Sequence, residues 1–173
     1  MSKKINSNLH NDIKANINNK ESDLNYLHNN SNVDLNSYNE KDEGLKENIK
    51  IENAIVALQQ ESTQEMLAHT LTVIRRRMKE KGRLIIAVEP PKADGNLNIQ
   101  AIKTDDGRTW WMAFTSFDEE IKGSGSVMST FMCDIDSLFE TALKTDEVSG
   151  IIINPWNKTI MLDKRLISIV IGK

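Results

Sequence analysis

The sequence predicts an α+β (α/β) domain with two N-terminal helices, a mixed but mainly antiparallel β-sheet with hairpins, helices packed on that sheet, and a disordered N-terminal leader. Three observations predict this class. Two apolar stripes with helical spacing come first, and short apolar runs separated by turn residues follow them. Residues 1–40 instead contain twelve asparagines and no comparable pattern. The expected order is two helices, three strands, an optional short helix, a strand, a helix, two strands and a last helix.

The leader is predicted to span residues 1–48, and the folded domain residues 49–173. An Asn-rich segment buries too little apolar surface to offset the entropy lost on ordering it. Two interpretations of the leader stay open. It is either a solvated extension or an interaction tail that docks through its few apolar residues, which are Leu24, Tyr26, Leu27, Val33, Leu35 and Tyr38.

The first two helices are predicted from apolar residues three and four apart. The first stripe is Ile51, Ile55 and Leu58, and the second is Leu67, Leu71, Ile74 and Met78. Ser62 and Glu65 fit a capping box at the start of the second helix. Gly82 is expected to end it in a left-handed conformation.

The first three strands follow from apolar runs and turn signals. The run "RLIIAVEPP" stops at two prolines, and "NLNIQAIKT" and "RTWWMAFTS" form a hairpin around "DDG" at residues 105–107. Trp110, Met112 and Phe114 are expected on one face of that hairpin. "DEE" (118–120) is interpreted as a surface turn, and "GSGS" (123–126) as a flexible connection.

The C-terminal part predicts a strand, a helix, a hairpin and a last helix. "VMSTFMCDI" indicates the strand, and the helix in "DIDSLFETALK" is expected to bury Leu138, Phe139, Ala142 and Leu143. "GIIIN" and "KTIML" flank the turn "NPWN", and Asp163 is placed to cap the helix in "KRLISIVIG".

Residues 50–173 resemble the N-terminal domain family of the SseB (enhanced serine sensitivity) proteins. The likeness is carried by "ENAIVALQQ", "LIIAVEP", "DGRTWWMAFTSFDE" and, most specifically, "GIIINPWNKTIML". The resemblance implies a small, cytoplasmic, bacterial domain with no established enzymatic chemistry. The chain departs from the family in its Asn-rich leader and in lacking the second, C-terminal domain that many members carry.

The turn residues Asn154, Pro155, Trp156 and Asn157 are the candidate partner-binding site. Pro155 fixes φ and Asn154 favours a turn, so the hairpin closes on conformational grounds alone. Trp156 then either folds back as a core plug or projects as an anchor for a partner, since tryptophan is enriched at interface hot spots. The expected partner is a protein, which includes a second copy of this chain.

A basic segment, "RRRMKEKGR", offers an alternative nucleic-acid site at a helix end. Its cations are Arg75, Arg76, Arg77, Lys79, Lys81 and Arg83. They are suited either to phosphate binding or to a solvated helix C-terminus, where cations oppose the helix dipole. The overall net charge of −3 and the lack of an aromatic residue in the segment argue against nucleic acid.

No pattern predicts catalysis, a cofactor or a metal ion. His10 and His28 lie in the leader, His69 stands alone in a helix, and Cys133 has no neighbouring Cys or His. Asp134 or Asp136 is expected to cap the following helix. The single cysteine and the absence of any apolar run long enough to cross a bilayer predict a cytoplasmic protein. The lack of a base for Cys133, Ser124 or Ser126 predicts a non-enzymatic one.

Overall fold

The computed structural model describes residues 43–89, 98–124 and 129–173. The described residues belong to one compact unit, Lys41–Lys173. The predicted leader lies outside the described residues as far as residue 42. Residues 43–48, which the sequence assigned to the leader, belong to the folded unit: Leu45 is buried, and the Asn48 amide donates to the carbonyls of Arg83 and Thr115. The boundary predicted at residue 48 is therefore several residues too late.

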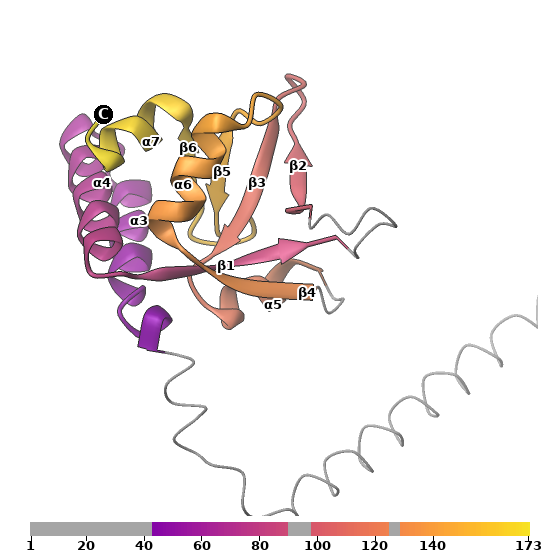
Figure 1. Ribbon diagram of the computed structural model, residues 1–173. Helices are drawn as coiled ribbons and strands as arrows, with labels where there is room; N and C mark the ends of the chain where they lie inside the picture. The colour runs from indigo at the N-terminus through magenta and orange to yellow at the C-terminus, as the bar shows by residue number, and fades with distance from the viewer. Residues whose placement is uncertain (1–42, 90–97, 125–128) are drawn as a thin grey trace, which may run out of the picture. The chain divides into compact units, whose positions relative to one another are not determined.

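The order of helices and strands is the predicted one, and it confirms an α+β fold (Figure 1). The elements are α3 (Ile49–Gln60), α4 (Gln64–Lys79), β1 (Arg83–Val88), β2 (Ala101–Lys103), β3 (Thr109–Phe114), α5 (Phe117–Ser124), β4 (Ser129–Asp134), α6 (Ile135–Lys144), β5 (Gly150–Ile153), β6 (Ile160–Asp163) and α7 (Lys164–Ile171).

The strands form one mixed sheet in the order β4-β1-β3-β5-β6, with β2 paired to the first half of β3. Every pairing is antiparallel except that of β3 with β5. A parallel pair needs a crossover, and here α5, β4 and α6 provide it. The register places Ala113 beside Ile153, so β3 and β5 end at the same edge.

The main core lies between one face of this sheet and four helices, α3, α4, α6 and α7. Figure 1 shows α3 and α4 side by side along one flank, with α6 and α7 in front of the strands. The apolar stripes predicted for the helices form this core. Its helical members are Ile51, Ile55, Leu71, Ile74, Met78, Ile135, Leu138, Phe139, Ala142, Ile167 and Val170, with Leu58, Leu67 and Leu143 partly buried around them.

A second, smaller cluster lies on the opposite face of the sheet. It contains Leu45, Ile85, Ala87, Met112 and Phe114. Trp110 is also buried, so the predicted face of β3 with Trp110, Met112 and Phe114 faces inward. The short helix α5 follows β3 directly, and its neighbourhood becomes the candidate site described below.

Two details at the ends of α4 differ from the prediction. Its N-cap is Thr63, whose hydroxyl accepts from the Met66 amide at 3.2 Å, whereas the Ser62 hydroxyl donates to the Leu58 carbonyl. At the other end the left-handed residue is Lys81, with φ of 59°, and not Gly82. Glycine is needed at 82 for space, because a Cβ there would lie 2.8 Å from the Arg77 carbonyl oxygen.

Candidate interaction surface

The loop 154–159 joins β5 to β6 and is held in shape from within. Asn154 and Lys158 both adopt left-handed backbone conformations, with φ of 51° and 48°. The Asn157 amide and the Thr159 hydroxyl both donate to the Asn154 carbonyl, at 3.3 and 2.6 Å. Asparagine tolerates the left-handed region better than most residues, which agrees with its predicted turn role.

Asn154 itself is fully buried and does not reach the surface. Its side-chain oxygen accepts from the Thr115 backbone amide at 2.9 Å, and its side-chain nitrogen donates to the Thr115 hydroxyl at 2.9 Å. The Asn154 amide also donates to the Ala113 carbonyl. The residue therefore ties the hairpin to the end of β3. Its assignment as a partner-contacting residue is corrected to a structural one, because no partner can touch a side chain with no exposed area.

A cluster of charged groups lies beneath the loop, and the sequence did not predict it. Glu52 of α3 is buried, accepts from the Thr115 hydroxyl at 2.7 Å and pairs with the Lys158 ammonium at 2.5 Å. Glu119 is also buried; it pairs with Lys122 at 2.6 Å and lies 3.7 Å from Lys158. Buried charges persist only when paired and hydrogen-bonded, as these are.

The protonation of this cluster follows from its contacts. Burial acts to raise the pKa of Glu52, but hydrogen bonds from Lys158, Thr115 and Ser116 outweigh it and lower that pKa below its usual 4.5. The hydrogen bond to Glu52 raises the pKa of Lys158 against the opposing effect of burial. The pair is thus ionised at neutral pH. Its chemistry is that of a structural ion pair, since a lysine with a raised pKa is a poor nucleophile.

Trp156 lies at the tip of the loop with 44% of its surface exposed. One side of its indole rests on the backbone of α5 at Gly123, where an added Cβ would come within 2.0 Å of the ring. Pro155 is half-buried, and the exposed Asn157 donates to the Glu119 carboxylate at 3.2 Å. Neither alternative for Trp156 holds alone, because the ring is packed on one side and open on the other.

The helix α5 has an inverted distribution of residues. Its carboxylates Glu119 and Glu120 are buried, whereas its apolar Phe117 and Ile121 are 45% and 66% exposed. A surface helix ordinarily shows the opposite arrangement. "DEE" is therefore not the surface turn that the sequence predicted, because the hairpin supplies Asn157 and Lys158 as partners for Glu119. Oε1 of Glu120 is buried and has no hydrogen-bond partner among the residues that the structure describes.

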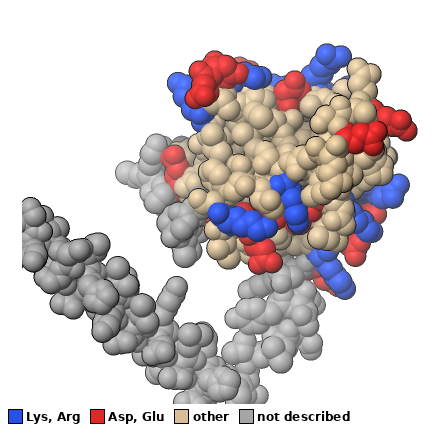
Figure 2. Space-filling view, turned by 180° about the vertical axis from the view of Figure 1, so that it is seen from behind, with Lys and Arg blue, Asp and Glu red and all other residues tan. Residues whose placement is uncertain are grey.

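These features define the candidate interaction surface: Phe117 and Ile121, one turn apart on one side of α5, and Trp156, whose ring contacts the same helix at Gly123 and so lies toward a different side of it. Figure 2 shows, on the side of the molecule away from the view of Figure 1, a broad uncharged area with Lys, Arg, Asp and Glu gathered mainly toward its margins. That area comprises polar as well as apolar residues.

The fold directs the cations of the basic segment 75–83 to different partners. Arg75 donates to the carbonyls of Ile169 and Val170 at the end of α7, which is a capping role. Arg77 is buried, and its guanidinium donates to the Asn48 side chain and the Gly44 carbonyl.

Two more cations of this segment form surface ion pairs, Lys81 with Asp136 at 3.0 Å and Arg83 with Asp134 at 2.9 Å. Asp134 is also the N-cap residue of α6, although its side chain makes no capping hydrogen bond. Within the described part of the chain, only Arg76 and Lys79 of this segment have no hydrogen-bonded or ion-paired partner.

Cys133 and His69 are not brought together with other reactive groups. Cys133 is half-buried on β4, and burial, followed by the charges of Asp134 and Asp136, raises the pKa of its thiol. His69 lies on the outer side of α4. Across the described ranges, no three His, Cys, Asp or Glu side chains are grouped so as to hold a metal ion. None of the described helices is long and apolar enough to cross a membrane.

Comparison with known proteins adds no relative. No protein-family model matches the chain, and no curated protein or solved structure is significantly similar to it. The resemblance to the SseB N-terminal domain family therefore stays a prediction that depends on the motifs quoted above.

Proposed function

We propose that this protein is a non-catalytic, cytoplasmic protein-interaction or regulatory module that binds a partner protein through Phe117, Ile121 and Trp156. The single observation that carries the proposal is the inverted helix α5, which leaves two large apolar side chains in water while it buries two carboxylates. Leaving such side chains exposed forgoes hydrophobic stabilisation, and a partner that covered them would recover it.

Two further observations support the proposal. The loop below Trp156 is fixed by Asn154 and by the Glu52–Lys158 pair, so the exposed ring is presented on a rigid support. Rigid aromatic anchors lose little conformational entropy when they bind. The resemblance to the SseB N-terminal domain family also favours a domain without enzymatic chemistry.

The test is capture of partners from a native lysate by the full chain and by single variants. Ile121→Ser and Trp156→Ala should each lose the captured protein, and Ile169→Ser should retain it. Ile169 is a matched control, because it is 42% exposed but lies on α7. Circular dichroism melting checks folding; Ile121→Ser should change the melting temperature little, since its side chain is mostly exposed.

Nuclease treatment of the lysate distinguishes the proposed protein binding from the alternative function, which is nucleic-acid binding. A protein that survives nuclease and is lost with Ile121→Ser supports the proposal. Equal capture by all variants would refute it. Material that disappears with nuclease, and with Arg76→Gln rather than Ile121→Ser, would instead favour a nucleic-acid-associated protein acting through the basic end of α4.

A further inference from the structure

The outer groove between α3 and α4 has an unusual lining. It holds a cavity of about 330 Å³, at the lower end of small-molecule sites. Its lining includes the cations Lys50, Arg76 and Arg77 together with His69 and Asn53, and it includes no carboxylate. The remaining lining residues are Ala54, Ala57 and Val73. The groove thus combines hydrogen-bond donors with a small apolar floor.

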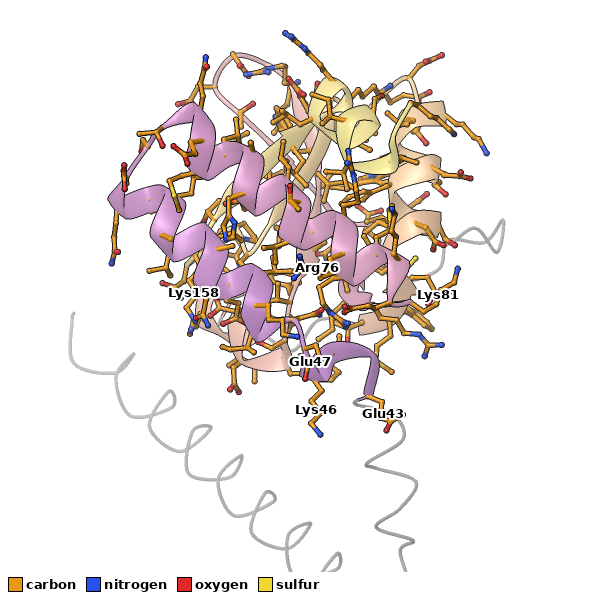
Figure 3. The ribbon with its side chains drawn as sticks, turned by 90° about the vertical axis from the view of Figure 1, so that its left-hand side faces the viewer. Glu43, Lys46, Glu47, Arg76, Lys81 and Lys158 are labelled. Atoms are coloured by element: carbon orange, nitrogen blue, oxygen red, sulfur yellow. The ribbon has the colours of Figure 1, made fainter. Side chains whose placement is uncertain are left out.

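The cations of the groove differ in whether another side chain of the protein already pairs with them. Arg76 is exposed and has no hydrogen-bond or ion-pair partner among the described residues. Figure 3, which faces α3 and α4, shows it between the two helices. Lys50 is held by Glu47 at 2.6 Å, but both side chains are about half exposed, and such a surface pair contributes little. Arg77 is buried behind them, and its guanidinium is paired with the Glu80 carboxylate at 2.8 Å. Arg76 is therefore the cation of the groove that is free to bind an anion.

The spacing of the groove residues sets the length of a ligand. The Thr70 hydroxyl donates to the Ala54 carbonyl, which fixes α3 and α4 side by side in opposite directions. Arg76 and His69 are two turns apart on one face of α4, about 10 Å along the helix. Val73 lies between them on the same face. An anionic group at Arg76 would therefore leave space for a compact body reaching toward His69.

We propose that this groove binds a small phosphomonoester. The phosphate is held by the Arg76 guanidinium, with Lys50 and the Asn53 amide as further donors, because arginine forms paired hydrogen bonds with two phosphate oxygens. The body of the ligand lies over Ala57 and Val73 toward His69. The site is separate from Phe117, Ile121 and Trp156. A test of phosphate binding in the groove is therefore independent of a test of the proposed partner surface.

The experiment is a titration of the uniformly ¹⁵N-labelled full chain, followed by NMR at pH 7.5 and constant ionic strength. The probes are inorganic phosphate, adenosine monophosphate and acetate. We expect saturable shifts in the amides of α3 and α4 and in the Asn53 side chain, with adenosine monophosphate binding more tightly than inorganic phosphate. Arg76→Gln should weaken this binding at least tenfold.

Lys79→Gln is the control variant, because Lys79 is exposed on the same helix and is not part of the groove lining. It should change the dissociation constant less than twofold. The inference is overturned if no probe gives a saturable response up to about 10 mM, roughly ten times a weak dissociation constant of about 1 mM. Equal losses from Arg76→Gln and Lys79→Gln, or equal binding of acetate and phosphate, would also overturn it.

Discussion

Asn154 offers the sharpest test of how the hairpin is held. Its side chain pairs with both the backbone amide and the hydroxyl of Thr115, and its backbone is left-handed. Replacing it with alanine leaves the buried Thr115 amide unpaired, which costs about 1–3 kcal/mol. A left-handed alanine adds about 1–2 kcal/mol. We therefore expect Asn154→Ala to lower the free energy of unfolding by about 2–5 kcal/mol, summing these two effects.

Asn154→Gly separates the two effects. Glycine adopts φ of 51° without strain but cannot pair with Thr115 either. It should therefore cost about 1 kcal/mol less than alanine, once its own entropy in the unfolded chain is counted. Lys81 provides the matched control, because it has φ of 59° and an exposed side chain. The difference between Lys81→Ala and Lys81→Gly measures the backbone effect alone.

The assay is urea denaturation of the full chain at pH 7, followed by tryptophan fluorescence and by circular dichroism. Unchanged m values would show that the variants differ in stability and not in the extent of unfolding. A loss below about 1 kcal/mol for Asn154→Ala would refute the buried role of its hydrogen bonds. If the alanine–glycine difference at 154 vanished while that at 81 persisted, the left-handed strain assigned to Asn154 would be refuted.

Two further predictions concern a helix cap and a buried ion pair. Thr63→Ala should lower the free energy of unfolding by about 1 kcal/mol, and Ser62→Ala should lower it by less than about 0.5 kcal/mol. The reason is that only the Thr63 hydroxyl accepts a hydrogen bond from a free amide of α4. Equal losses of stability in thermal melts of the two variants would contradict this. Glu52→Gln should destabilise the protein by about 1–3 kcal/mol at pH 7, since it removes the ionised partner of Lys158. Glu52 has a pKa below 4.5 in the folded state, so its stabilisation is present above pH 4.5 and is lost as the pH falls through that lower value. The difference from wild type, measured in urea from pH 7 to pH 3, should therefore shrink only at the acid end, and a constant difference would argue against the ion pair.

Local patterns were sufficient to predict the order of the elements. Within each helix the buried apolar residues are three or four positions apart, as Ile51 and Ile55 are in α3 and Leu71 and Ile74 are in α4. That spacing indicates which side of a helix is buried. The cap at Asp163 was also predictable, because a capping side chain and its target amide are three residues apart; Asp163 accepts from Leu166 at 2.7 Å.

The polar cluster was not predictable from local patterns. Glu52 and Lys158 are 106 positions apart, and Glu119 meets them only when α5 folds onto the hairpin. A run of three acidic residues ordinarily indicates solvent exposure, and only the fold supplies the cations that allow burial. The one local signal was Ser116 before Glu119: its hydroxyl accepts from the Glu119 amide at 3.3 Å, as a helix N-cap does.

The exposed Trp156 follows from this division of roles. Asn154 and Lys158 turn inward and fix the loop, so the loop does not require the indole as a plug. Gly123 provides a flat backbone surface for one side of the ring, and 44% of the side chain stays in water. An aromatic side chain of about 200 Å² then leaves about 90 Å² for a partner, which corresponds to about 2 kcal/mol on burial. That is the size of an interface hot spot. By the same measure, the roughly 110 Å² that Trp156 already buries contributes about 3 kcal/mol to folding. Trp156 therefore serves both folding and binding, and Ile121, which is 66% exposed, is the residue whose substitution separates the two.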